Sequence, residues 1–358
     1  MATIKDVAQA AGVSVTTVSR ALNSHSDVAV STRERVARIA AQLGYHPNHM
    51  ARSLQGTRTN TIGLVIPRLV HRHVDSFWLE FISGVSETVA DSEYDLLLST
   101  GRDFNAEYAH YQRMVRTCRV DGVILCDVRV RDPRISYLRQ NDARFVAFGR
   151  TLGEERFSWV DVDGAAGVCD AVDYLIGLGH RRIAYLGTQR AFSFSHFRHE
   201  GYLHALLRAN VSYDEDLVVQ DLDATSDLET LIDRLLRLSS PPTALIVCAE
   251  LLASGVMRVL RRRELRIPMD LSVVAFDDSP ITRYEDPPLT SIRQDVQALG
   301  AQVAGLLIRQ LGEDEPQPVQ ELVRPQLIVR QSTAAPVEAR DRLDRSPAVN
   351  TAPARSTM

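Results

Sequence analysis

Apolar positions at helical spacing dominate the first 45 residues. A first short helix is predicted by apolar residues three and four positions apart: Ile4, Val7, Ala8 and Ala11. Thr3 stands before it as a candidate N-cap. Gly12 should end this helix, because glycine takes the left-handed conformation that a tight turn needs, and Val13 would then plug the space between helices.

A second helix is predicted from Ser14, a good N-cap residue, through Leu22. Its inward face would hold Val18, Ala21 and Leu22, and its outward face Thr16, Thr17, Ser19 and Arg20. Short polar side chains ending in an arginine suit phosphate oxygens and base edges in a major groove.

A third helix is predicted to begin with a capping box formed by Ser31 and Glu34 and to end at Gly44. Its apolar stripe comprises Val36, Ile39, Ala40 and Leu43. Three short helices around a glycine turn predict a helix-turn-helix unit whose second helix reads DNA. A three-helix bundle without a DNA role is the alternative.

From Thr61 onward, short apolar runs alternate with amphipathic stretches. Strands are predicted at 62–66, 95–98, 122–125, 145–148, 183–186, 244–247 and 273–276, and helices at 77–90, 165–178 and 251–262. This alternation predicts a doubly wound α/β protein with parallel sheets. Because such sheets bind ligands beyond the carboxyl ends of their strands, residues just after each strand are candidate site residues.

Charge and cysteine content add a functional contrast. Residues 1–58 carry a formal charge of +4 and the remainder −8, within a total of −4 over 358 residues. A cationic segment on an acidic body is typical of a nucleic-acid reader joined to a domain that avoids nucleic acid. The four cysteines form no CxxC pair, and no signal peptide or membrane span is evident, so a cytosolic protein is expected.

Enzyme motifs are missing from the sequence. There is no GxSxG elbow, GxGxxG fingerprint or Walker A loop. His199 and His204 are one residue too far apart to share a helix face as zinc ligands. The chain is therefore not expected to be an enzyme or to carry a cofactor or metal.

Several motifs in order resemble the LacI/GalR family of bacterial transcriptional regulators. They are TIKDVAQAAGVSVTTVSRALN, VSTRERVARIAAQLGYHPN, ARSLQG and TIGLVIP, and the resemblance extends over roughly residues 2 to 330. It implies base reading by Val15, Thr16 and Arg20 and backbone support from Thr17 and Ser19. The wider predicted DNA-binding set adds Thr3, Ser14, Asn48, Ala51 and Leu54.

The resemblance also divides the chain. Residues 1–47 would be the DNA-binding domain and 48–58 a hinge, with Asn48 as its N-cap, that orders on operator DNA. A leucine from each subunit, here Leu54, would enter the minor groove. An ordinary interdomain linker is the alternative.

Residues 61–331 would then form a core of two subdomains related to periplasmic sugar-binding proteins. The first would cover about 61–159 and 296–320, and the second about 163–290 and 323–331. By resemblance, the effector-binding residues are Arg102, Phe148, Arg150, Trp159, Arg198 and Asp277. Many relatives carry an Asn-Asp pair where this chain has Ala249 and Glu250, so Glu250 is added as a replacement, with a reshaped pocket as the alternative.

These residues suit a polyol, because carboxylates and guanidinium groups can each bond paired hydroxyls and a tryptophan face can stack on a sugar ring. The expected function is a dimeric repressor of carbohydrate genes, released from operator DNA by a mono- or oligosaccharide. SFWLEFISGV and RVRDPRISYL favour the branch that responds to raffinose or α-glucosides. The alternatives are a nucleobase-corepressed regulator, for which Trp159 and Phe148 would stack on a planar ring, and a solute-binding protein without a DNA role.

The segment 332–358, rich in Pro, Ala, Ser and Arg, is expected to be a disordered tail. It lacks the leucine heptads of a tetramer-forming coiled coil, so a dimer is predicted.

Overall fold

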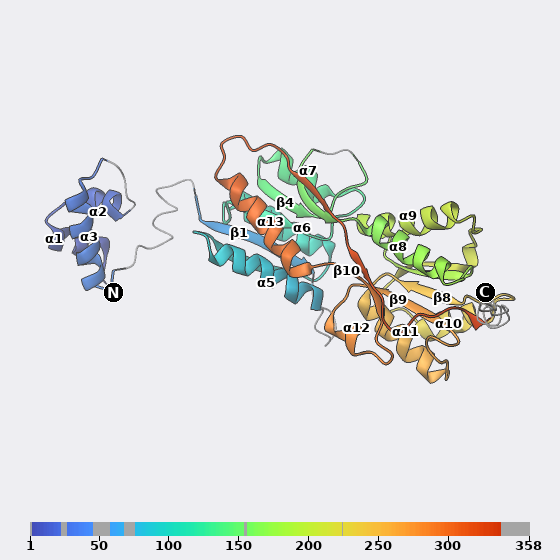
Figure 1. Ribbon diagram of the computed structural model, residues 1–358. Helices are drawn as coiled ribbons and strands as arrows, with labels where there is room; N and C mark the ends of the chain where they lie inside the picture. The colour runs from blue at the N-terminus through green and yellow to red at the C-terminus, as the bar shows by residue number, and fades with distance from the viewer. Residues whose placement is uncertain are drawn as a thin grey trace, which may run out of the picture. The chain divides into compact units, whose positions relative to one another are not determined.

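The computed structural model describes residues 2–22, 27–45, 58–67, 76–153, 156–223 and 225–337. It divides into two units, residues 1–60 and residues 61–358 (Figure 1). The first described segments contain only helices and the second unit contains two sheets. The two units are considered separately below.

The N-terminal unit contains helices α1 (Ile4–Ala11), α2 (Val15–Leu22) and α3 (Val30–Gln42). Thr3 and Asp6 form a capping box at α1, and Gly12 closes that helix with a φ of 67°. The Ser14 hydroxyl accepts a hydrogen bond from the Thr17 N–H at 3.1 Å, so it caps α2. These local features confirm the predicted turn between the first two helices.

The third helix begins differently from the prediction. Ala29 is its N-cap residue and α3 starts at Val30, so the predicted Ser31–Glu34 capping box is wrong. Val28 is 8% exposed and packs into the core of this unit. Because that anchor lies two residues before Val30, the chain turns into the helix before Ser31 is reached.

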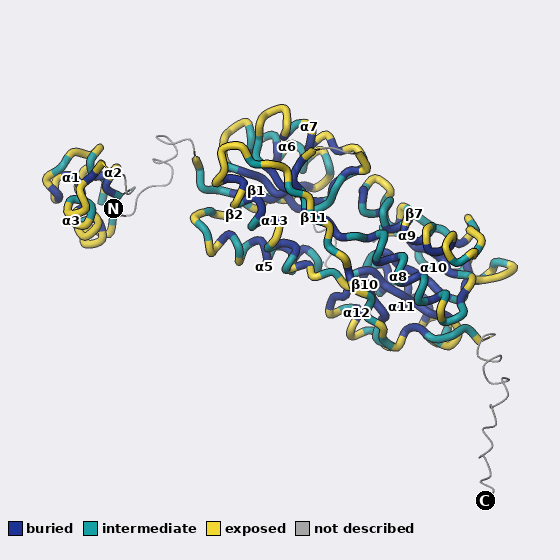
Figure 2. Tube along the Cα trace, turned by 45° about the horizontal axis from the view of Figure 1, so that its top comes forward, coloured by how far each residue is buried: buried dark blue, intermediate teal, exposed yellow. Residues whose placement is uncertain are grey.

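Residues 61–337 form two lobes, each with a six-stranded sheet between helices (Figures 1 and 2). Lobe 1 has the strand order β11-β5-β4-β3-β1-β2, and all of its pairings are parallel. Its strands are β1 (Thr61–Pro67), β2 (Asp95–Gly101), β3 (Gly122–Leu125), β4 (Arg144–Phe148), β5 (Ser158–Val162) and β11 (Gln320–Val323). Its helices are α5 (Ser76–Ala90), α6 (Phe104–Arg116), α7 (Pro133–Gln140) and α13 (Val296–Leu311).

Lobe 2 repeats this plan with the strand order β12-β10-β9-β8-β6-β7, in which only the β10–β12 pair is antiparallel. Its strands are β6 (Ile183–Thr188), β7 (Val218–Leu222), β8 (Ala244–Val247), β9 (Ser272–Phe276), β10 (Thr290–Arg293) and β12 (Gln326–Ile328). Its helices are α8 (Gly164–Gly177), α9 (Ser193–Arg208), η1 (Glu215–Leu217), α10 (Leu228–Leu236), α11 (Glu250–Arg262) and α12 (Pro280–Tyr284).

Clusters of buried apolar residues lie on both faces of each sheet, where the helices pack against the strands. In lobe 1, α5 and α13 pack on one face and α6 and α7 on the other. In lobe 2, α8 and α9 cover one face and α10 and α11 the other. The buried residues gather along the strands (Figure 2). This arrangement confirms the predicted doubly wound α/β fold.

All seven predicted strands are present, and β5, β7, β10, β11 and β12 are further strands. Most of these lie at or near sheet edges or contain polar residues, so they lack a continuous apolar run. The chain crosses between lobes after β5, after β10 and after β11. These crossings bring strand ends of both lobes to one cleft.

The predicted start of the tail at residue 332 is too early. Ser332 is fully buried, and its hydroxyl accepts from the Thr290 N–H at 2.8 Å and donates to the Val273 carbonyl at 2.6 Å. The Ala334 carbonyl bonds to the buried His180 ring at 2.8 Å. Residues 332–334 therefore belong to lobe 2, and residues 338–358 lie outside the described residues.

Within the described ranges, no helix is both long and apolar enough to cross a bilayer.

Candidate functional site

The outer face of α2 carries the side chains predicted to read bases. Val15, Thr16 and Arg20 are exposed, whereas Thr17 and Ser19 are half-buried. The Arg20 guanidinium pairs with the Asp27 carboxylate at 2.7 Å, and both side chains are about half exposed. Exposure therefore differs between the predicted base readers and the predicted supporting residues, and the contact of either set with DNA stays a prediction.

Thr3 and Ser14 both have structural partners at helix starts. Asp6 accepts hydrogen bonds from the Thr3 N–H at 2.7 Å and from its hydroxyl at 2.8 Å. Ser14 and Thr17 share a hydroxyl–hydroxyl hydrogen bond of 2.8 Å. Both Thr3 and Ser14 remain exposed, so capping and a DNA contact are compatible. The other predicted DNA-binding residues, Asn48, Ala51 and Leu54, lie outside the described residues.

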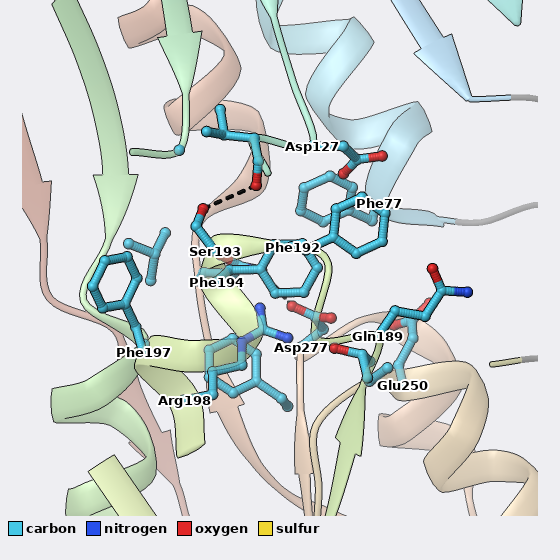
Figure 3. Close-up of a pocket in the computed structure, with 18 of the residues that line it drawn as sticks. Phe77, Asp127, Gln189, Phe192, Ser193, Phe194, Phe197, Arg198, Glu250 and Asp277 are labelled. Atoms are coloured by element: carbon cyan, nitrogen blue, oxygen red, sulfur yellow. Dashed lines mark hydrogen bonds between the residues drawn. The ribbon is translucent and has the colours of Figure 1, made fainter. Parts of the chain in front are cut away.

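A pocket of about 390 Å³ lies between the two lobes, where strand ends meet (Figure 3). This volume is within the usual range for small-molecule sites. Aromatic rings from both lobes line it: Phe77, Trp78 and Phe148 from lobe 1, and Phe192, Phe194, Phe197 and Phe276 from lobe 2. Its charged lining residues are Asp127, Asp161, Arg198, Asp223, Glu250 and Asp277.

Arg198 is the central cation of this pocket. It is 8% exposed, lies 3.5 Å over the Phe276 ring and 4.8 Å over the Phe194 ring, and donates to the Cys248 carbonyl at 2.8 Å. Its Nε is buried without a hydrogen-bond partner among the described residues. A buried guanidinium with unused donor capacity is suited to paired ligand hydroxyls.

Asp277 faces the same space from the end of β9. Burial raises its pKa, while the charge of Arg198 and a hydrogen bond from the Gln294 amide lower it. Its backbone is left-handed, with a φ of 73°, which costs a non-glycine residue about 1 kcal/mol. Asp127, which follows β3 and also lines the pocket, has a φ of 51°. Such backbone conformations concentrate at functional sites.

Glu250 and Phe148 also line the pocket. Glu250 begins α11, is 4% exposed, and accepts a hydrogen bond from the Ser76 hydroxyl of lobe 1 at 2.6 Å. Ala249 lines the pocket next to it. The structure thus brings together Phe148, Arg198 and Asp277, which the resemblance implied, with Glu250, which was added as a replacement where the sequence departs from the family, and their contact with a ligand stays a prediction.

Three predicted effector residues do not line this pocket. Arg102 follows the edge strand β2, and its side chain is 79% exposed. Trp159 is half-buried against the α6–α7 side of the sheet. Arg150 contacts two residues that line the pocket: its guanidinium lies 3.4 Å from the Asp161 carboxylate and 4.1 Å over the Phe197 ring. Burial raises the pKa of Asp161 to about 6, and the charge of Arg150 opposes this shift.

Sequence reasoning missed several lining residues. Gln189 stands directly after β6 and Asp127 two residues after the end of β3, so applying the strand-end rule to every strand would have found them. The phenylalanines of FSFSHFR carry no comparable signal, because aromatic residues at this spacing are common on packed helices. No group of three or more metal-ligating side chains occurs within the described part of the chain.

Comparison with known proteins identifies the family of the chain. The family described as bacterial regulatory proteins, lacI family, matches residues 3–48, and a periplasmic binding protein-like domain matches residues 172–333. The HTH-type transcriptional regulator AglR of Rhizobium meliloti (strain 1021) is 35% identical over 355 residues, covering 98% of each chain. The chain belongs to the lacI family of bacterial regulatory proteins.

Two solved structures are similar to this chain over most of its length. A transcriptional regulator CelR–cellobiose complex is 32% identical, with a TM-score of 0.70, and covers 93% of this chain and all of that chain. The lac repressor dimer bound to operator and the anti-inducer ONPF is 25% identical, with a TM-score of 0.77, covering 93% and 99%. The protein is therefore a DNA-binding transcriptional regulator of a non-enzymatic, cytoplasmic family.

Proposed function

We propose that this lacI-family regulator is a homodimeric repressor of carbohydrate genes that leaves its operator when a saccharide occupies the pocket between the lobes. The observation that carries the proposal is the buried Arg198 beside Asp277 within aromatic walls. Hydroxyl pairs can bond both groups, while the rings cover the C–H faces of a sugar.

The similarity to a cellobiose complex supports a saccharide ligand, and the similarity to an operator-bound repressor dimer supports the assembly. The exposed face of α2 supplies a recognition surface of the kind that enters a major groove. Two such units related by a twofold axis would match a near-palindromic operator.

A nucleobase effector is the competing proposal, and one observation weakens it. It relied on Trp159 and Phe148 stacking on a planar ring, yet Trp159 does not line the pocket. The other candidate, Phe148, does line the pocket, and its ring centroid lies 5.0 Å from that of Phe81 in lobe 1. The carboxylates of the pocket can accept hydrogen bonds from the hydroxyl groups of a sugar, whereas the apolar face of a planar ring offers them no donor.

The test is a titration of the full chain against fluorescent duplex DNA from the region upstream of its own gene, by anisotropy, with cellobiose, maltose, raffinose, adenine and guanine as added ligands. Operator affinity should fall with one saccharide and be unchanged by the purines. Stronger operator binding with a purine, or no effect of any ligand that stabilises the core in a thermal-shift assay, would contradict the proposal.

A further inference from the structure

Two loops from opposite lobes bond to each other beside the pocket. The Val128 carbonyl of lobe 1 accepts from the backbone N–H of Ser193 at 3.0 Å and from its hydroxyl at 2.9 Å (Figure 3, dashed line). The Val130 N–H donates to the Ala191 carbonyl at 3.1 Å. Arg129 and Phe192 form an antiparallel bridge between these bonds. We call these residues the cross-lobe contact.

The cross-lobe contact completes helix α9. Ser193 is the first residue of α9, and its N-cap residue, Phe192, provides no side-chain hydrogen bond. The first N–H groups of a helix have no partner within the helix, so an acceptor must come from elsewhere. Here the carbonyl of Val128, a residue only 1% exposed, takes that role from the other lobe.

Hydrogen bonds from Arg134 hold the loop on the lobe 1 side of the contact in place. The Arg134 guanidinium is buried and donates to the carbonyls of Cys126 at 3.0 Å and Asp127 at 2.8 Å. It also pairs with the Asp132 carboxylate at 2.6 Å, and Asp132 accepts from the Arg129 N–H at 3.1 Å. Because this loop is held from behind, separating the lobes must break the cross-lobe contact instead of bending the loop.

The contact also adjoins the ligand-facing side chains. Asp127 and Val128 line the pocket from lobe 1, and Phe192 and Ser193 line it from lobe 2. Arg198 lies on the same helix, five residues after Ser193. A ligand that bridges Arg198 and lobe 1 therefore favours the same arrangement of lobes that the contact favours.

We propose that Ser193 is a positioning residue of the effector response: through Val128 it caps α9 from the other lobe and holds the cleft closed around Arg198. Ligand and contact stabilise one state of the lobes, so each strengthens the other. The naming of the ligand as an effector rests on the proposed function, whereas the closure of the cleft does not.

The test compares Ser193→Pro with Ser193→Ala in the full chain. Proline is accepted at the first residue of a helix, and the extended backbone of Phe192, with φ −91° and ψ 138°, suits a residue before proline. Proline removes both Ser193 donors, while alanine removes the hydroxyl alone. Hydrogen exchange of the Val130 amide and the radius of gyration by X-ray scattering measure closure without any ligand.

Alanine should reduce protection of the Val130 amide by about fivefold and proline by at least tenfold, as expected for the loss of one and of two net hydrogen bonds. The proline variant should also show a larger radius of gyration and bind cellobiose, used as the probe, more than tenfold more weakly.

Unchanged protection and radius in a folded proline variant would overturn the proposal, as would equal effects of alanine and proline. Should the proline variant fail to fold, the alanine variant decides the matter through its Val130 protection. If cellobiose does not bind the natural chain, the proposed function fails on that probe, while the ligand-free measurements still decide whether the contact closes the cleft.

Discussion

Helix α2, which is predicted to read DNA, and the pocket place charge in opposite environments. Arg20 on α2 is about half exposed, and its ion pair with Asp27 lies in water. Arg198 in the pocket is 8% exposed and lies over the Phe276 ring, and its charge lowers the pKa of the buried Asp277 carboxyl. An exposed ion pair contributes little to folding, whereas a buried charge needs compensation from its surroundings.

On α2, the side chains expected to bind DNA are separate from those that stabilise the fold. In the pocket, the same side chains are expected to do both. Side chains on the outer face of α2 can change without disturbing the core of the helical unit, which is built from Val7, Val18, Val36 and their neighbours. In the pocket, buried polar groups such as Arg198 and Glu250 have partners in the fold and are also predicted to bind the ligand. The first region should tolerate substitution and the second should not.

The largest effect is expected from Arg198→Met, which leaves the Asp277 carboxylate buried without its compensating charge. The free energy of unfolding of the core should fall by about 3 kcal/mol, and saccharide binding should be lost. Denaturant unfolding measures the first and calorimetric titration the second.

A double variant, Arg198→Met with Asp277→Asn, provides the control. With neither charge present, most of the stability should return while saccharide binding stays absent. No recovery of stability would show that Arg198 acts through packing on Phe276 and Phe194 and not through its charge.

A smaller effect is expected from Arg20→Ala, and it should be limited to operator binding. Operator affinity should fall by about 1–3 kcal/mol, the usual value of one base contact by arginine, while the free energy of unfolding changes by less than about 0.5 kcal/mol. Anisotropy and thermal unfolding measure the two. Arg102→Ala, at an exposed arginine of lobe 1 that pairs with Asp103, is the matched control and should leave operator affinity unchanged.

The same comparison can be made for pH dependence with Glu107, a partly buried carboxyl of lobe 1 whose side chain is 12% exposed. Burial raises its pKa from 4.5 to about 7, opposed by Arg134, whose guanidinium lies 3.6 Å away. Between these values the folded chain holds a proton that the unfolded chain has lost, so stability contributed by this group falls as pH rises from 4.5 to 7 and is level above.

The variant Glu107→Gln should therefore be more stable than the natural chain at pH 8, by roughly 1–2 kcal/mol after allowance for screening, and indistinguishable near pH 4.5. Denaturant midpoints across this range check it, with the exposed Glu93→Gln as the control for net charge. An equal gain at both pH values would contradict the assignment to Glu107 titration.

The same contrast explains which features could be predicted from the sequence. Thr3, Gly12 and Ser14 act within a few residues of their partners, so motif and spacing sufficed. The pocket is assembled from the ends of separate strands. Trp159 and Asp161 share a face of β5, yet only Asp161, nearer the carboxyl end of the strand, lines the pocket. That distinction depends on where the second lobe closes over the strand.

The contact between Val128 and Ser193 lies beyond any local pattern. Its residues are 65 positions apart, and one of its two hydrogen bonds joins a backbone N–H to a backbone carbonyl, groups that every residue except proline provides. The predicted Ser31–Glu34 capping box failed for the opposite reason. The local motif is present in the sequence, but the packing of Val28 into the core sets the start of the helix before Ser31. Long-range packing decided both outcomes.

The smallest expected effect concerns Ser14, which both caps α2 and was predicted to touch DNA. Ser14→Ala removes the acceptor of the Thr17 N–H and should lower the stability of the helical unit by about 1 kcal/mol. Ser14→Asp keeps an acceptor at the cap, so stability should be retained, but it places a negative charge on the exposed face beside α2. If Ser14 lies against a phosphate, the aspartate variant must bind operator more weakly than the alanine variant, despite being the more stable of the two. The reverse order, with affinity following helix stability, would restrict Ser14 to capping, so the helical unit would keep its fold and its DNA contacts on separate side chains.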